Sequence, residues 1–367
     1  MTDTPKTQST PAIDGDTQRN ITAALEPYAA PPHLPTSLKY LGLNLLYCAV
    51  VVSVTYYVRT LGVATWILAP SYALVMGTVS FGLWVLGHEC GHGAFAPKRW
   101  QNDLVGFVLH SALLVPYWSW QYSHAKHHRY TSHTIMGETH VPKTSESKDD
   151  ACVSRLLGCR VKAAFKIFKY LLFGWPAYLL VNKSGGMMQI NGKTPLRSDR
   201  FKDHFHSGSQ VMPRKWTIEA STVGCLCTML ALWWSGRQNA MLWYLGPWVV
   251  VNAWLTLVTW LHHTDVDVPH YGPKEFTWLR GALSTVDRPY HWFFNHLHHN
   301  IGSTHVLHHL RPKIPHYRAV AATAALKPVL GTLYRSDSTP MRDAVWRAAH
   351  MCTLIKSREG IQYYKER

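Results

Sequence analysis

The chain has 367 residues, of which 47% are hydrophobic and only 16% are charged. Soluble globular domains carry about 25% charged residues, so this composition disfavours an ordinary soluble protein. The net charge is +16, and the chain contains 16 Trp and 18 Tyr. A nucleic-acid binder would rarely combine such a charge with long apolar runs. Aromatic residues at the lipid boundary and Lys and Arg in cytoplasmic segments are typical of an integral membrane protein.

The first 39 residues are polar and rich in Thr, Pro, Ala and Asp. They contain no apolar core of a signal peptide, and their acidic residues disfavour an organelle transit peptide. We therefore expect residues 1–39 to form a cytosolic N-terminal tail that is partly disordered. The remaining residues, 40–367, are expected to form one membrane domain.

Four apolar segments approach or exceed the length that crosses a hydrocarbon core, about 20 residues in a helix. Short polar turns join them in pairs, which predicts two helical hairpins, each with both ends on one side. The long loops carry most of the Lys and Arg, so the positive-inside rule places them in the cytosol. The prediction is an all-α integral membrane protein with four transmembrane helices and a cytosolic helical cap: spans at 40–58, 63–87, 218–234 and 241–261, and cytosolic segments at 88–217 and 262–367.

Two shorter apolar runs do not fit a full span. Residues 104–118 contain His110 and end near Pro116, which favours a half-buried or re-entrant segment. Residues 170–181 are interrupted by Pro176 and are expected at the interface. The seven cysteines form no paired zinc-ribbon array, so reduced thiols are the expected state.

Histidines gather in three clusters that follow apolar segments. The first cluster is HECGH, the second HAKHH and the third HVLHH. Spacings of three or four residues place side chains on one face of a helix, so each cluster can direct two imidazoles at one metal. Side-chain packing alone does not explain why so many polar histidines should lie beside a bilayer. We interpret these eight residues as catalytic metal ligands: His88, His92, His124, His127, His128, His305, His308 and His309.

The HECGH stretch also fits the H-E-x-x-H pattern of zinc proteases, in which the glutamate is the base. A protease would leave the other two clusters without a role, and eight histidines exceed the ligands of one ion. Imidazole suits Zn, Cu, Fe and Ni, and two irons with open positions for oxygen fit the number of ligands. Isolated histidines are expected to be ordinary hydrogen-bonding residues: His110, His140, His204, His206, His270 and His291.

Long motif blocks resemble the membrane fatty-acid desaturases, in particular the plant and fungal delta-12 and omega-3 group. The resemblance runs from about residue 40 to residue 355, and it is weak at residues 1–39 and 150–210, for which we assign no function. The blocks are HECGHGAFAP, VPYWSWQYSHAKHHRYTSHT, LVTWLHHT, WLRGALSTVDRPY and IGSTHVLHHLRPKIPHYRAVAAT.

The resemblance implies a non-haem di-iron centre held by the eight histidines of the three clusters. It also implies a ninth ligand after the last span, for which His263 rather than His262 has the matching position. His299 is a candidate residue that would contact these ligands rather than the metal itself. A ligating histidine commonly donates its other N–H to a carboxylate or carbonyl. The carboxylates that could accept it are Glu89, Glu138, Asp265 and Asp287.

The implied reaction inserts a cis double bond into an acyl chain with O2 as co-substrate. Unactivated methylenes need a metal–oxygen oxidant. The substrate supplies two of the four electrons that reduce O2, and an external donor must supply two. The chain has no haem, dinucleotide or ferredoxin motif of its own. The resemblance implies membrane cytochrome b5 and its reductase as partners, a fatty-acyl lipid as substrate, and the endoplasmic reticulum as location.

The regiochemistry stays open within the family. HECGH favours a delta-12 enzyme, which turns an oleoyl into a linoleoyl chain, whereas the block around the third cluster resembles the omega-3 group. Hydroxylases and acetylenases on the same scaffold are further alternatives. The position of the double bond should depend on a tunnel. Its candidate lining residues are Trp84, Val85, Trp254 and Leu257.

Two functions from other classes are alternatives: a membrane zinc metalloprotease that uses HECGH, and a non-enzymatic metal carrier. A carrier needs histidines inside the spans, whereas these lie at and beyond the span ends. The last five residues, Tyr363 to Arg367, weakly resemble an aromatic signal for retrieval to the endoplasmic reticulum.

Overall fold

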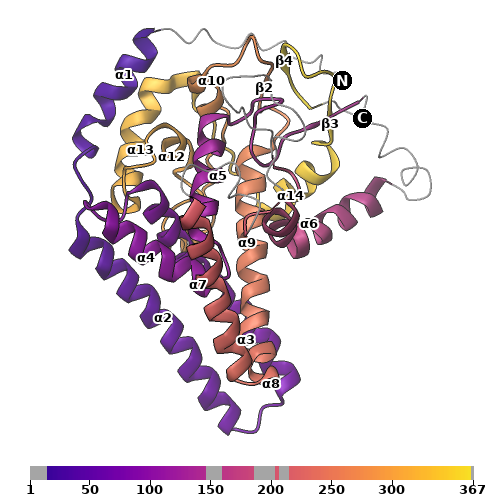
Figure 1. Cartoon of the computed structure of the whole chain (residues 1–367). Coiled ribbons are helices and arrows are strands. Elements are labelled where there is room, and N and C mark those ends of the chain that lie inside the picture. The colour runs from indigo at the N-terminus through magenta and orange to yellow at the C-terminus, as the bar shows by residue number, and fades with distance from the viewer. Residues whose placement is uncertain (1–14, 146–158, 186–202, 206–214, 365–367) are drawn as a thin grey trace.

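The computed structural model describes residues 15–145, 159–185, 203–205 and 215–364 (Figure 1). These residues are mostly helical, with four strands of two residues each. The long helices α2 (Leu34–Thr60), α3 (Thr65–His92), α7 (Lys215–Trp234) and α9 (Gly246–His263) run toward the lower end of the view. Most of the short helices and the strands gather at the opposite end. The predicted all-helical architecture is therefore confirmed in its main features.

The two predicted hairpins are present. In the first, a turn at Gly62, whose φ is 82°, connects two long helices; in the second, Gly236 has a φ of 90°. Glycine adopts these left-handed conformations without steric cost, so both chain reversals are short. The helices extend beyond the predicted spans at several ends because flanking polar residues continue the helical hydrogen bonds. Their bounds are α2 (Leu34–Thr60), α3 (Thr65–His92), α7 (Lys215–Trp234), α8 (Arg237–Asn239), a π-helical turn (Ala240–Leu245) and α9 (Gly246–His263).

Helix α3 lies at the centre of the long helices and packs against α2 and α9. Small residues permit this close approach, as is usual between helices in a membrane. A Cβ atom at Gly77 would lie 2.6 Å from the carbonyl oxygen of Pro247 on α9. The outward sides of the long helices carry exposed apolar residues such as Val54 and Leu230, which suits contact with lipid.

Within the described residues, five helices rather than four are long and apolar enough to cross a membrane. The fifth is α6 (Cys159–Val181), part of which was predicted to lie at the interface. In Figure 1, α6 runs sideways relative to α3 and α9, and it packs against α9 and α14. Length and composition therefore do not establish the predicted number of four spans.

The predicted N-terminal tail is helical from Gly15. Helix α1 buries Ile21 and Leu25 against α13, so this part of the tail is packed rather than disordered. Residues 1–14 lie outside the described part. The other short helices are α1 (Gly15–Leu25), η1 (Glu26–Tyr28), α4 (Arg99–Ala112), α5 (Tyr117–Arg129), α10 (Trp278–Ala282), α11 (Trp292–Leu297), α12 (His305–Leu310), α13 (His316–Leu330), η6 (Gly331–Leu333) and α14 (Met341–His350).

The C-terminal segment joins two loops through short strands. Strand β3 (Leu354–Ile355) pairs in parallel with β1 (Lys143–Thr144), and β4 (Ile361–Gln362) pairs antiparallel with β2 (His270–Tyr271). Tyr364 is buried and contacts the ring of His270. Of the five residues that resemble a retrieval signal, at least this aromatic side chain is part of the fold. Residues 365–367 lie outside the described part.

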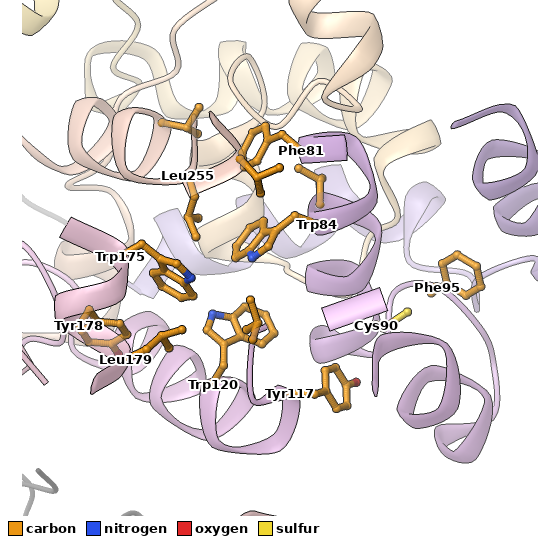
Figure 2. Packing of buried hydrophobic residues seen from close by; sticks show 14 of the residues in the cluster. Phe81, Trp84, Cys90, Phe95, Tyr117, Trp120, Trp175, Tyr178, Leu179 and Leu255 are labelled. Carbon is orange, nitrogen blue, oxygen red and sulfur yellow. The ribbon is translucent and has the colours of Figure 1, made fainter. Parts of the chain in front are cut away.

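The largest apolar core lies where α3, α5, α6 and α9 meet (Figure 2). Trp84 of α3 contacts Trp120 of α5 and Trp175 of α6 edge to face, with ring centroids 5.6 and 6.2 Å apart. Such edge-to-face pairs are a favourable arrangement of aromatic rings. This core lies directly beside the first histidine cluster, because Trp84 stacks on His88 at 5.4 Å.

Candidate metal centre

Helix packing brings the first two histidine clusters together. The first cluster occupies the last turn of α3, which ends at Gly93 with a φ of 72°. Two glycines of α3 admit the neighbouring rings: a side chain at Gly87 would strike His110, and a Cβ at Gly91 would lie 2.6 Å from Trp120. Helix α5 can therefore lie close to α3, and its histidines meet those of the first cluster.

Five histidines from three helices form the first metal group: His88, His92, His124, His128 and His308. One ligand nitrogen from each lies within 4.8 Å of all the others. The Nε2 atom of His124 lies 2.9 Å from that of His88 and 3.2 Å from that of His128.

Four further histidines form the second metal group. His127, His263 and His309 have ligand nitrogens within 4.8 Å of one another. The Nε2 atom of His263 lies 3.1 Å from that of His127 and 3.0 Å from that of His305, which adds the fourth member. The stacked rings of His128 and His309 are 4.2 Å apart, so the two metal groups are adjacent.

The nitrogen separations match those of ligands around metal ions. Two imidazole nitrogens at about 2.0–2.1 Å from one metal lie roughly 3 Å apart when the angle between them is about 90–109°. The Nε2 atoms of His92, His308 and His309 are buried and have no hydrogen-bond partner among the described residues. Such orphaned acceptors are costly unless something binds them, so the donor set fits metal ions.

Burial keeps the histidines outside the spans neutral. It lowers the pKa of His127 to about 4, and it lowers the pKa values of His124, His128, His305, His308 and His309 well below the ordinary value, with a smaller contribution from neighbouring imidazoles. A neutral imidazole offers a lone pair, whereas a protonated one does not. The ligand nitrogens are therefore available to metals at neutral pH.

Polar contacts to Nδ1 fix the orientation of two imidazoles in the second metal group. His127 Nδ1 lies 2.8 Å from the carbonyl oxygen of Glu138, and His309 Nδ1 lies 3.2 Å from Thr131 Oγ1. A proton on Nδ1 of His127 leaves its Nε2 free to bind a metal. The Glu138 carboxylate also accepts from Lys126 at 2.9 Å and from Tyr178 at 3.0 Å. Glu138 thus supports the ligands, although through its backbone carbonyl.

The two neighbouring histidines of α9 have different surroundings. His263 faces the second metal group, whereas His262 bonds the carbonyl oxygen of Val286 through Nδ1 and stacks on His305 at 4.4 Å. Of these two histidines, His263 is therefore the one whose ring nitrogen lies among those of the second metal group.

Glu89 does not face the metal groups. Both of its carboxylate oxygens accept hydrogen bonds from His316, one from the backbone N–H and one from the ring, each at 2.6 Å. A protease base must be able to reach a metal-bound water. This pairing, together with the second metal group, disfavours the metalloprotease hypothesis.

The other predicted supporting residues bond groups other than the imidazole rings of the two metal groups. Asp265 pairs with Arg288 and Arg347, and Asp287 accepts from Val306 N and from the Tyr334 hydroxyl. Among the described residues, His299 contacts Asn44, Tyr40 and His316 but none of the nine grouped histidines.

Most isolated histidines behave as ordinary polar residues. His110 lies 3.2 Å from the Trp84 carbonyl, His204 bonds Ser123, and His291 is exposed. His270 differs from the expectation, because it is buried and neither of its ring nitrogens has a hydrogen-bond partner among the described residues. His140 is closer to the site than expected, because its ring stacks on that of His263 at 6.0 Å. His206 lies outside the described residues.

Several residues around the site were not anticipated from the sequence: Lys126, Thr131, Tyr178, Arg288, His316, Tyr334, Asp337 and Arg347. Four of them lie inside quoted motif blocks, which marked their segments: Lys126, Thr131, Arg288 and His316. The other four follow no local pattern, since their partners lie far away in the chain.

Known proteins are similar to this chain in sequence over most of its length. The fatty acid desaturase family model matches residues 64–339. The chain is 38% identical over 359 residues to a delta(12)-acyl-lipid-desaturase of Punica granatum, covering 92% of this chain and 89% of the relative. It is 36% identical over 357 residues to a delta(12) acyl-lipid conjugase (11E,13E-forming) of Impatiens balsamina, with the same coverage.

An oleoyl-12-hydroxylase of Ricinus communis is 39% identical over 295 residues, which cover 79% of this chain and 73% of the relative. The residues matched by the family model, 64–339, include all three histidine clusters. These similarities confirm the resemblance that the motif blocks indicated: the chain belongs to the fatty acid desaturase family.

Proposed function

We propose that this desaturase is a delta-12 acyl-lipid enzyme that converts oleoyl into linoleoyl chains at a di-iron centre. The observation that carries the proposal is the convergence of nine imidazoles into two adjacent metal groups. The relative from Punica granatum, which matches most of the chain, supports the delta-12 position.

The first group would hold one iron through His88, His92, His124, His128 and His308, and the second group would hold the other through His127, His263, His305 and His309. When bound, the irons supply the O2-dependent oxidation that removes two hydrogens from unactivated methylenes. The protein keeps the imidazoles neutral by burial, and Glu138 and Thr131 hold two of them in orientation.

The apolar core beside the first metal group suits an acyl chain. Trp84 stacks on His88, and Trp120 stacks on His124 at 4.8 Å. Trp84 and Val85 are buried in this core and Trp254 packs against it, in accordance with a role in lining the acyl path. Leu257 packs instead in a separate cluster near Trp260, so we do not propose it as a lining residue.

The electron donor, location and membrane orientation follow from the family and the charge. The net charge of +16 would favour an acidic partner, and we propose cytochrome b5 with its reductase. We place the enzyme in the endoplasmic reticulum membrane with four spans, the metal groups facing the cytosol, and α6 lying along the boundary.

Hydroxylation and conjugation are alternatives on the same scaffold, because relatives named for these activities match as well as the desaturase does. Expression in yeast fed with oleate, followed by lipid analysis, separates them. We expect linoleate as the new product. A hydroxy acid, a conjugated product, or a triene formed only from linoleate would contradict the delta-12 assignment, and a single zinc per chain would contradict the di-iron centre.

A further inference from the structure

The three consecutive residues Val286, Asp287 and Arg288 are buried and lie in the block WLRGALSTVDRPY. Each contacts an element that carries histidines of the second metal group. We propose, resting on the di-iron function above, that Asp287 and Arg288 are positioning residues that align His263 with His305.

Val286 anchors the end of α9. Its N–H donates to the carbonyl oxygen of His262 at 3.0 Å, and its own carbonyl oxygen bonds His262 Nδ1. This reciprocal pair holds the segment alongside the last turn of α9, directly before the ligand His263.

Arg288 contacts α9 and the residues after it on both sides of His263. Its Nε donates to the carbonyl oxygen of Leu261 at 2.9 Å, and its Nη2 donates to Asp265 Oδ2 at 2.6 Å. The third guanidinium nitrogen pairs with Asp337. The guanidinium is a rigid planar fork, so one side chain fixes both flanks of His263 at once.

Asp287 holds the start of α12. Its Oδ1 accepts the N–H of Val306 at 2.7 Å, and its Oδ2 accepts the Tyr334 hydroxyl at 2.5 Å. His305 precedes Val306 directly, and its Nε2 lies 3.0 Å from that of His263. Because Asp287 and Arg288 are joined by one peptide bond, they set the positions of these two histidines relative to each other.

Disrupting the contacts of Asp287 and Arg288 should weaken metal binding mainly at the second metal group. Four of the five histidines in the first group lie on α3 and α5, and only His308 comes from α12. Within the described residues, the side chains of Asp287 and Arg288 make no hydrogen bond to α3 or α5. Loss of the alignment should therefore weaken one metal position much more than the other.

Arg288→Lys and Asp287→Asn test the proposal in the full-length protein, purified in detergent and loaded with iron. Both changes are conservative: lysine keeps the buried charge beside Asp265, and asparagine keeps an acceptor for Val306. A competing chelator is used to follow iron release from the two groups, and Mössbauer spectra report the coupling between the irons. We expect about 10–100-fold weaker iron binding at the second group, the range for residues that orient metal ligands, with the first group unchanged.

The matched controls are Arg342→Lys and Asp343→Asn, which alter an exposed Arg–Asp pair on α14. These controls should release iron as the wild type does. The proposal is overturned if Arg288→Lys and Asp287→Asn also release iron like the wild type, or if both groups weaken together in proportion to a lower melting temperature. A wild-type protein that binds no pair of irons would refute the di-iron function and this inference with it.

Discussion

Two adjacent histidines at the end of α9 differ in what their ring nitrogens contact. His263 Nε2 lies close to the nitrogens of His127 and His305, whereas His262 bonds a backbone carbonyl. Both side chains are buried, so burial alone does not distinguish them. What differs is the partner of each nitrogen.

His263→Ala should abolish diene formation and remove one iron, because a metal position with four imidazoles loses one of them. His262→Asn should keep both irons and measurable activity, because asparagine can still donate to the Val286 carbonyl. Iron content and lipid analysis in yeast measure the two effects. If His262→Asn lost the iron and His263→Ala retained it, the assignment of the ligand would be wrong.

His133 provides a pH dependence that is separate from the metal groups. Its Nδ1 accepts the backbone N–H groups of Ile135 and Met136 at 3.1 and 3.2 Å, and burial lowers its pKa to about 4. The unfolded chain, with an ordinary pKa near 6.5, therefore binds more protons between pH 6.5 and 4. This contribution to stability is complete above about pH 6.5 and is lost as the pH falls toward 4.

His133→Asn should keep an acceptor for both N–H groups and remove the titration. The melting temperature of the variant should then fall less than that of the wild type between pH 7 and pH 5. The matched control is His291→Asn, because His291 is exposed and its Nδ1 also accepts a backbone N–H, from Phe293. Equal slopes for wild type and His133→Asn would show that His133 does not titrate as described.

At the scale of helices, glycine determines how closely α3 approaches α9. A Cβ at Gly77 would lie 2.6 Å from the Pro247 carbonyl oxygen and 2.5 Å from Val250 Cβ, so neither neighbour can yield without moving backbone. Gly42 on α2 has no atom within 4 Å of the same position. Comparing alanine substitutions at these two glycines therefore distinguishes the effect of close helix packing from that of helix propensity.

Gly77→Ala should destabilise the protein by about 1–3 kcal/mol, the usual cost of overpacking. Gly42→Ala should stabilise it by about 0.5–1 kcal/mol, because alanine is the better helix former. Unfolding in detergent with increasing denaturant measures both changes. A neutral Gly77→Ala would mean that α3 and α9 pack less closely than described.

The elements that the sequence predicts well are those that depend on local pattern. The uncharged runs gave the two hairpins, and the spacing of three and four residues gave the clusters that converge on the metal groups. Other features depend on distant contacts that no local pattern reveals. Examples are the pairing of Glu89 with His316, the burial of Tyr364 against His270 and the packing of α1 on α13.

For the whole molecule, the contacts at both ends of α6 bear on the number of spans. Near its start, Lys166 donates to the Cys352 carbonyl at 3.1 Å, and near its end, Tyr178 donates to Glu138. Both contacts lie in the half of the molecule that contains the metal groups. The next helix, α7, begins there too, since Ser221 accepts the N–H of Trp118 of α5. A helix with both ends on one side does not cross the membrane, which favours four spans.

Single cysteines, introduced into a parent chain that lacks the seven native cysteines, test this arrangement. A membrane-impermeant thiol reagent is added to sealed microsomes, whose cytosolic face is outward. We expect labelling at Lys183→Cys, just after α6, and at Lys313→Cys, just after α12. Leu61→Cys and Ser235→Cys, in the two hairpin turns, should be labelled only after detergent opens the vesicles. All four positions are exposed, so protection reports the membrane rather than burial. Protection at Lys183→Cys together with labelling at Lys313→Cys would mean that α6 crosses the bilayer, and the four-span arrangement would be wrong.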